Sequence, residues 1–338
     1  MKGEIYLTTK FNALVVNKDD EQFSVNVQSL SLDDLPKGEV LIRIKYSSVN
    51  YKDSLATIPD GNIVSSYPFV PGIDLAGVVV SSDDSRFQEG DEVIATSYEI
   101  GVSHYGGYSE YARIPADWIV PLPEGLTLKE AMVIGTAGFT AALSVQRLLD
   151  NGLTPDSGKV LVTGATGGVG SFAVSILATL GFTVEASTGK ESEAEFLTKL
   201  GAASIVSRNA VYDGKIRALG KQKWAAAVDP VGGEPLAALL SQIQYGGSVA
   251  VSGLTAGTKL PATVFPFILR GVNLLGIDSV YCPMETRLSI RERLASDFKP
   301  ANIEEFIQKE VGLQELPDVL SIPLKGQAKG RILVNCHH

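Results

Sequence analysis

Several residue types are scarce in this sequence. It contains two cysteines, Cys282 and Cys336, and three histidines, two of which, His337 and His338, end the chain. Two distant cysteines exclude a disulfide framework and are typical of a protein that folds in a reducing compartment. So few histidines and cysteines also leave little material for a zinc site. His337 and His338 can be the remnant of a purification tag, and we assign them no role.

The sequence also lacks an excess of positive charge, a membrane-length apolar run and internal repeats. Its net charge of −9 at pH 7 argues against nucleic-acid or anionic-membrane partners, because both require a basic face. Residues 1–14 contain no continuous apolar core of signal-peptide length, and no segment has the long uncharged run of a membrane span. We therefore expect a cytoplasmic protein that acts on a small molecule.

Two regions of different character are present. The 338 residues exceed what one core usually supports, so two domains are expected. Residues up to about 117 hold short Val- and Ile-rich runs separated by turns, which predicts a compact β-rich domain. From residue 159, apolar strands and helices alternate, which predicts a doubly wound parallel sheet. The fold class is therefore α/β.

The segment between these regions begins with Thr127 and Glu130 at the spacing of a helix capping box. An apolar helical run follows. It contains Gly135 and Gly138, which normally weaken a helix. We expect this part of the helix to pack closely against another element.

The run "VLVTGATGGVG", residues 160–170, feeds a strand directly into a helix through glycines. Ala165, Gly167 and Gly170 occupy the positions of the G-x-G-x-x-G pattern, with Ala at the first. Free N–H groups at a helix N-terminus and positions without side chains allow a diphosphate to approach the backbone. In this strand-helix context the pattern predicts a dinucleotide site rather than an empty tight turn.

The identity of the dinucleotide depends on the tip of the next strand. An NAD site requires a carboxylate about 20 residues further on. The residues there are Ser187, Thr188, Gly189 and Lys190, and Arg208 follows the strand after that. Hydroxyl groups and cations suit the 2′-phosphate of NADPH, which we favour. If the strand ends earlier, Glu185 can accept from the ribose instead and the cofactor would be NADH.

Several strings together resemble the medium-chain dehydrogenase/reductase superfamily. Within it they are similar to the zinc-free quinone oxidoreductase branch and its acryloyl-CoA reductase-like group, over nearly the whole chain. These strings are "SSVNYKDSLA", "PFVPGIDLAGVV", "IGTAGFTAAL", "TGATGGVGS", "STGKES", "YGGSVAVSGL", "PFILRGVNLLGIDSV" and "GRILV".

The resemblance implies a domain plan. A GroES-like β-rich catalytic domain would comprise residues 1–127 and 283–338, and a Rossmann dinucleotide-binding domain residues 128–282. The nicotinamide would lie between the two lobes. The resemblance also implies a homodimer that pairs through the edge strand Val272–Val280.

Zinc-dependent relatives place a Cys near position 50, a His in the "PG-x-[DE]" turn and a third ligand near "GTAGFTA". This sequence has Asn50 and Ile73 at the first two positions, and neither Cys nor His in the third stretch. We therefore expect no metal, and we expect His104 to be a loop or cleft-wall residue.

Without a metal, an electron-poor double bond or a quinone is the feasible acceptor of a hydride, and prearranged donors must stabilise the oxygen that gains charge. The segment "NYKD" supplies candidates. Tyr51 would contact the nicotinamide or the substrate, Asn50 the substrate carbonyl or the carboxamide, and Lys52 the developing charge. Asp53 would fix Lys52 or the ribose, or alternatively cap a helix.

The expected cofactor contacts come from several loops, with "GIDSV" offering backbone groups to the carboxamide, as the family pattern suggests. Arg287, Arg291 and Arg293 can meet CoA phosphates, although a solvated helix face explains them better. The predicted cofactor-binding residues are Tyr51, Thr136, Thr166, Gly167, Gly168, Val169, Gly170, Ser187, Thr188, Gly189, Lys190, Arg208, Ser252, Gly253, Leu254 and Ile277.

Three functions compete at this point. The first is an NADPH-dependent reductase of an activated alkene such as acryloyl-CoA, and the second is an NADPH:quinone oxidoreductase. The third is a non-catalytic NADPH-binding protein, since fold alone does not fix function. The intact "NYKD" segment favours an enzyme.

Overall fold

The structure is a computed structural model that describes residues 10–19 and 22–337. His338 and residues 1–9 lie outside the described residues. The chain forms two compact units: unit 1 is Met1–Thr136 with Asn302–His338, and unit 2 is Ala137–Ala301. The boundaries between the units, 136/137 and 301/302, lie further along the chain than the expected boundaries 127/128 and 282/283. Helix α2 (Leu128–Asp150) changes direction at Gly135, and helix α8 (Met284–Leu294) packs on Phe139 of unit 2.

Unit 1 is β-rich, as expected. Among the described residues its main sheet has the order β14-β15-β3-β4-β5-β7, with β6 paired to β3, while β1 and β2 form a separate antiparallel pair. The strands are β1 Lys10–Lys18, β2 Phe23–Ser31, β3 Val40–Val49, β4 Asp74–Ser82, β5 Glu92–Thr96, β6 Tyr111–Ile114, β7 Ile119–Pro121, β14 Ile307–Gly312 and β15 Arg331–Asn335, and the helices are α1 Tyr51–Ala56 and α9 Leu316–Val319.

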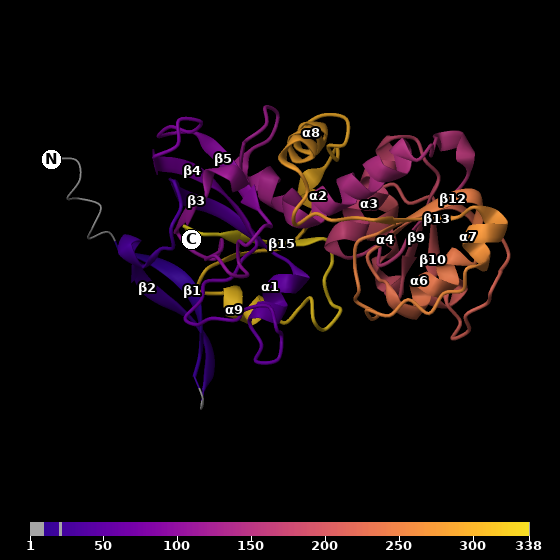
Figure 1. Ribbon diagram of the computed structural model, residues 1–338, viewed down its shortest axis with the longest axis horizontal. Helices are drawn as coiled ribbons and strands as arrows, with labels where there is room; N and C mark the ends of the chain where they lie inside the picture. The colour runs from indigo at the N-terminus through magenta and orange to yellow at the C-terminus, as the bar shows by residue number, and fades with distance from the viewer. Residues whose placement is uncertain (1–9, 20–21, 338) are drawn as a thin grey trace. The chain divides into compact units, whose positions relative to one another are not determined.

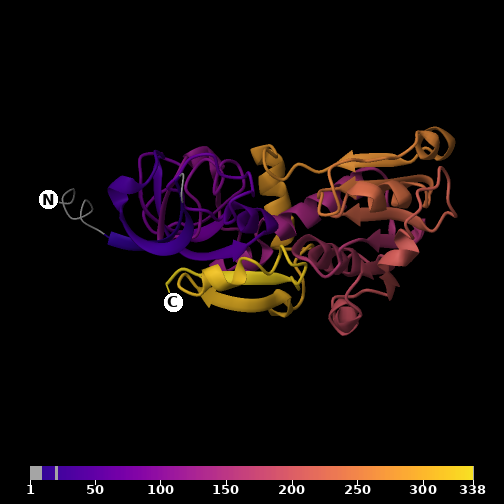
Figure 2. The same cartoon turned by 90° about the horizontal axis from the view of Figure 1, so that it is seen from below.

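The last strand of unit 1 determines much of the site geometry. β15 runs antiparallel to β3, so that Ile332 lies opposite Val49, and parallel to β14. Figure 2 shows β14 and β15 side by side in yellow. This register brings Arg331 to the end of β3, where helix α1 begins.

Unit 2 contains the predicted doubly wound parallel sheet. Its order in the described chain is β10-β9-β8-β11-β12-β13, and every pairing is parallel. The order reverses between β8 and β11, where such sheets bind dinucleotides. The elements, most of them labelled in Figure 1, are β8 Val160–Val162, α3 Gly168–Thr179, β9 Val184–Thr188, α4 Ala194–Lys199, β10 Ser204–Ser207, α5 Arg208–Val211, β11 Trp224–Asp229, α6 Gly233–Leu240, β12 Ile243–Val251, α7 Phe265–Arg270 and β13 Asn273–Gly276.

Two details differ from expectation. The edge strand predicted over Val272–Val280 is shorter, because β13 ends at Gly276. Helix α2 is long and apolar enough to cross a membrane by length and composition, contrary to the expectation of no such segment. However, 78% of its apolar window is buried inside the protein, and Gly135 interrupts it with a φ of 51°. We interpret α2 as core helix.

The predicted capping box at the start of α2 is confirmed. The Thr127 backbone N–H donates to Glu130 Oε2 over 2.8 Å, and the Glu130 backbone N–H donates to Thr127 Oγ1 over 3.2 Å. The predicted close packing is found at Gly135. A Cβ there would come within 2.5 Å of Asp74 Oδ2 and 2.7 Å of Arg331 Nη2.

Candidate functional site

The glycine-rich turn of unit 2 has the geometry of a diphosphate-binding loop. Gly164 has a φ of 54°, and a Cβ on Gly170 would lie 2.4 Å from the Gly164 carbonyl oxygen. Helix α3 begins at Gly168 with Gly167 as its N-cap. The first N–H groups of a helix have no partner within it, so Gly168, Val169 and Gly170 offer backbone donors to an anion. The Gly167 N–H donates to the Gly164 carbonyl over 3.0 Å.

The tip of β9 gathers the residues predicted to hold a 2′-phosphate. Strand β9 ends at Thr188, and Lys190 follows within a turn in which its N–H donates to Thr188 Oγ1 over 3.0 Å. The Arg208 side chain lies across Gly189, where a Cβ would come within 2.6 Å of Arg208 Nε. Burial lowers the pKa of Lys190, and the charge of Arg208 acts in the same direction, against Glu193. Lys190 and Arg208 therefore both lie at the end of β9 where Thr188 stands.

Glu185 lies near the start of β9, away from its tip. Its carboxylate accepts from Lys159 Nζ over 2.7 Å and from Trp224 Nε1 over 2.8 Å. The strand therefore does not end early, and Glu185 already has partners at the opposite end of it. This placement disfavours the ribose contact that would select NADH.

The neighbouring loops of unit 2 are tied together by Asp229, which sequence reasoning missed. Its buried carboxylate accepts from Thr163 Oγ1 and from the Gly232 N–H over 2.8 Å, and its carbonyl accepts from the Ser252 N–H. Within the described residues, Ser252 Oγ is buried and has no hydrogen-bond partner. An unsatisfied buried hydroxyl favours a ligand there. The Ile277 N–H donates to the Val251 carbonyl over 3.0 Å, which fixes the backbone at the end of β13.

In unit 1, the segment Asn50–Asp53 lies at the junction of β3 and α1. Asp53 is fully buried, and its carboxylate accepts from the N–H groups of Asn50 and Ile73, each over 2.8 Å. Burial, with Asp74 adding to it, raises the pKa of Asp53 to about 6. Tyr51 is 41% exposed and Lys52 is half-buried. The capping alternative for Asp53 therefore has support, and its contact with a ribose stays a prediction.

Asp74 is the centre of the unit 1 site, and the sequence reasoning did not single it out. It accepts from Asn50 Nδ2 over 2.8 Å, from Ser48 Oγ over 2.7 Å and from the Thr136 N–H over 3.0 Å. Thr136 Oγ1 also lies 3.2 Å from Ser97 Oγ. The backbone of Ser97 has a φ of 66°. An acid inside the apolar run "PGIDLAGVV" was the available signal. Thr136 is therefore joined to Asn50 through Asp74.

The residues at the three expected zinc-ligand positions do not form a metal site. Asn50 uses its amide on the two carboxylates, Ile73 has no donor side chain, and the corner of α2 presents backbone groups. Among the described residues, no three His, Cys, Asp or Glu side chains gather as metal ligands. Catalytic zinc requires three such ligands, and the residues at these positions do not supply them.

Other candidate residues lie elsewhere. Arg287 and Arg291 of α8 are each 1% exposed, with the guanidinium carbon of each 5.0 Å from the Phe139 ring centroid. This corrects the expectation of a solvated helix face for these two. Arg293 pairs with Asp297, as expected of a partly solvated residue. His104 lies in a loop, edge-on to Trp118.

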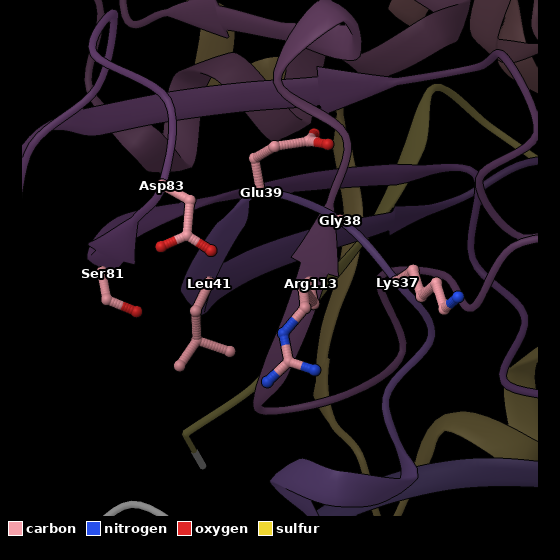
Figure 3. A pocket seen from close by; sticks show the side chains of 7 residues that line it. All are labelled: Lys37, Gly38, Glu39, Leu41, Ser81, Asp83 and Arg113. Atoms are coloured by element: carbon pink, nitrogen blue, oxygen red, sulfur yellow. The ribbon is translucent and has the colours of Figure 1, made fainter. Parts of the chain in front are cut away.

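A surface hollow in unit 1 lies at the start of β3, the opposite end of that strand from Asn50. Figure 3 shows side chains of both charge signs around it. This mixture selects no ligand, and none of the predicted site residues lines it. The lining residues are Lys37, Gly38, Glu39, Leu41, Ser81, Asp83 and Arg113.

The two units match two family descriptions. Residues 36–124 match the alcohol dehydrogenase GroES-like domain, and residues 168–293 match the zinc-binding dehydrogenase domain. Together with the parallel sheet of unit 2, these matches show that the chain belongs to the medium-chain dehydrogenase/reductase superfamily, a class of nicotinamide-dependent oxidoreductases.

Closer relatives narrow this class. The chain is 60% identical over 328 residues to YhfP of Bacillus subtilis, named provisionally as a quinone oxidoreductase, covering 97% of this chain and 99% of that protein. It is 52% identical over 327 residues to the acrylyl-CoA reductase AcuI of Ruegeria pomeroyi, covering 96% and 99%. Within the superfamily, the chain therefore belongs to the zinc-free group of acrylyl-CoA reductases and quinone oxidoreductases.

Solved structures agree with this assignment. The structure of YhfP with NAD bound has a TM-score of 0.95 at 60% identity and covers 97% of this chain and all of that one. The YhdH oxidoreductase of Salmonella enterica, solved in complex with NADP, has a TM-score of 0.93 at 44% identity and covers 96% and 99%. The predicted combination of a GroES-like and a Rossmann domain is confirmed.

Proposed function

We propose that this protein is a zinc-independent, NADPH-dependent reductase of activated carbon–carbon double bonds, with an enoyl thioester such as acryloyl-CoA as its substrate class. The observation that carries the proposal is the 52% identity, over 96% of the chain, to a protein named acrylyl-CoA reductase. The absence of three metal ligands among the described residues agrees with an acceptor that needs no Lewis acid.

NADPH is the proposed cofactor because two cations and two hydroxyls lie at the tip of β9, while Glu185 is engaged elsewhere. The glycine-rich turn would hold the diphosphate, and Ser252 Oγ would meet the nicotinamide half. The B. subtilis relative was solved with NAD and the S. enterica relative with NADP, so the group includes structures of both kinds. The cations decide our choice for this chain.

When bound, NADPH supplies a hydride to the β-carbon of the unsaturated thioester and is oxidised to NADP⁺, while a proton is added at the α-carbon. The chain has to orient the substrate and to stabilise the negative charge that develops on the carbonyl oxygen. Tyr51, exposed at the first turn of α1, and Lys52 beside it are the proposed donors. Asn50 and Asp53 hold that turn in place through their mutual hydrogen bonds.

A quinone reductase is the second candidate, and the 60% identity to YhfP favours it. Steady-state NADPH oxidation with acryloyl-CoA, enones and small quinones separates the two, with added chelator as a control for metal. We expect kcat/KM for acryloyl-CoA to exceed that for quinones, with no effect of chelator. A higher value for quinones would favour the second function. Cofactor binding without turnover of any acceptor would favour a non-catalytic NADPH-binding protein.

We further propose a cytoplasmic homodimer that pairs through the edge strand β13. Both cysteines are free and buried, as a reducing compartment favours. Helix α7, which directly precedes β13 in the chain, and the residue before it expose apolar side chains, and such exposure favours an interface. Val264 is 65% exposed, Ile268 69% and Leu269 55%. Sedimentation equilibrium is expected to give a dimer for the wild type and a monomer for Ile268→Glu. A monomeric wild type would contradict the proposal.

A further inference from the structure

Arg331, the first residue of β15, is a buried arginine whose guanidinium joins segments far apart in the sequence. It is 3% exposed. Its contacts come from the end of β3, the start of β4 and the corner of α2. They are Nη2 to Ser48 Oγ at 2.6 Å, Nη1 to Asn50 Oδ1 at 3.1 Å and to the Val49 carbonyl at 3.2 Å, Nε to the Val133 carbonyl at 3.1 Å, and Nη2 to Asp74 Oδ2 at 3.5 Å.

These contacts fix the orientation of the Asn50 amide. Its oxygen accepts from Arg331, while its Nδ2 donates to Asp74 over 2.8 Å and to Asp53 over 3.2 Å. A cation on one side and two carboxylates on the other admit only one orientation of the amide. Asn50 immediately precedes Tyr51, so the same contacts fix the start of α1.

The same guanidinium supports the corner of α2. At Gly135 there is no room for a side chain, because a Cβ would lie 2.7 Å from Arg331 Nη2. The next residue, Thr136, donates its N–H to Asp74 over 3.0 Å. Arg331 and Asp74 thus connect Asn50 and Thr136 in one hydrogen-bond network.

We propose that Arg331 is a positioning residue for the reduction: through the Asn50 amide and the Gly135–Thr136 corner, it sets where Tyr51 and Thr136 present their polar groups. The inference rests on the reductase function proposed above. The planar guanidinium donates in fixed directions to four acceptors and pairs with the Asp74 carboxylate, which a lysine ammonium cannot reproduce. A change at Arg331 is therefore expected to lower kcat although this side chain touches no substrate.

The charge of Arg331 also acts on the buried acids. The titratable groups that face this cluster are Asp53, Asp74, Tyr108 and Arg331 itself. Removing the Arg331 charge makes ionisation of the buried Asp53 carboxyl less favourable. The pH profile of kcat is therefore expected to move to higher pH in variants that lose the charge, by about one unit.

The test uses the full-length enzyme with whichever acceptor the wild type reduces best. We expect Arg331→Ala to lower kcat by about 100-fold and Arg331→Lys by about 10-fold, with the KM for NADPH within about 2-fold, because misplacement affects the chemical step. Added guanidinium ion at millimolar concentration should restore part of kcat to Arg331→Ala. It should restore nothing to the matched control Arg86→Ala, which removes a surface arginine paired with Asp84 and Asp117 and should keep wild-type kcat.

Two outcomes overturn the inference: an unchanged kcat and pH profile in folded Arg331→Ala, or a loss of kcat that follows NADPH affinity alone. If the Arg331 variants do not fold, Ser48→Ala removes one contact and should lower kcat in the same direction by about 3-fold. An unchanged kcat in that variant then overturns the inference. A wild type that reduces no acceptor would instead refute the proposed function. A double-mutant cycle of Arg331→Ala and Asn50→Ala, measured as the free energy of unfolding, would then test the positioning claim. Non-additive effects are expected, and purely additive effects would refute the claim.

Discussion

Unit 1 and unit 2 prepare their candidate site residues in opposite ways. In unit 1, Asp74, Asn50 and Arg331 bind one another, so that few of their hydrogen-bonding groups are left for a ligand. In unit 2, four of the seven residues of the turn 164–170 are glycines, and Ser252 Oγ has no partner among the described residues. Side chains that must keep one orientation are fixed by mutual contacts, whereas an anion-binding surface needs open donors and space.

The largest expected effect tests the open surface of unit 2. Gly170→Ala should displace the turn, because its Cβ would lie 2.4 Å from the Gly164 carbonyl oxygen. We expect a lower Tm and a loss of kcat/KM for NADPH of about 100-fold or more. In Gly167→Ala the Cβ would lie 3.4 Å from the same oxygen, an ordinary contact. It should keep the Tm and lose NADPH affinity, as calorimetry and fluorescence titration can measure. Unchanged NADPH binding in Gly167→Ala would show that the diphosphate lies elsewhere.

The next prediction tests the closed network of unit 1. The pKa of Asp53 is raised to about 6, mainly by burial, so the native state holds this proton more tightly than the unfolded chain. The free energy of unfolding should therefore fall as the pH rises from about 4 to about 6, by on the order of 3 kcal/mol from this group. Urea unfolding at a series of pH values should show this fall in the wild type and a smaller one in Asp53→Asn. If the free energy of unfolding depended on pH in the same way in both proteins, ionisation of Asp53 would not destabilise the native state.

A smaller effect tests the assignment of the 2′-phosphate to the end of β9. Lys190→Ala and Arg208→Ala should each raise the KM for NADPH by about 10- to 100-fold, the value of a charge-assisted hydrogen bond, and leave NADH nearly unaffected. Lys199→Ala is the matched control, since Lys199 pairs with Glu195 on the surface of α4. Equal effects on the two cofactors would remove the 2′-phosphate assignment.

The smallest effect separates stability from function within unit 1. Thr127→Ala removes the hydrogen bonds of Thr127 Oγ1 with the Glu130 carboxylate and the Glu130 N–H and should lower the free energy of unfolding by about 1 kcal/mol. Since this cap lies outside the Asp74 network, kcat should not change. Urea unfolding and steady-state kinetics on the same variant check both parts, and a clear fall in kcat would extend the network to the start of α2.

The sequence predicted the turn and the sheet of unit 2 well. Glycines between an apolar strand and a helix, followed by regular strand-helix alternation, are local signals that act over a few residues. It predicted Asn50–Asp53 as site residues but not their contacts. Asp74 and Arg331 gave weak signals: an acid in an apolar run and an arginine at the start of the strand "RILV".

What the sequence by itself determined is therefore local: the capping box at Thr127, the glycine-rich turn at 164–170 and the hydroxyls and cation at 187–190. Only the tertiary structure decided which distant residues share a hydrogen bond. The pairing of β15 with β3 brings Arg331 to Asn50, more than half the chain away, and fixes Asp74 between them. The reason is physical: periodicity and turn preference depend on neighbouring residues, whereas a buried charge finds its partner only when the sheet has formed.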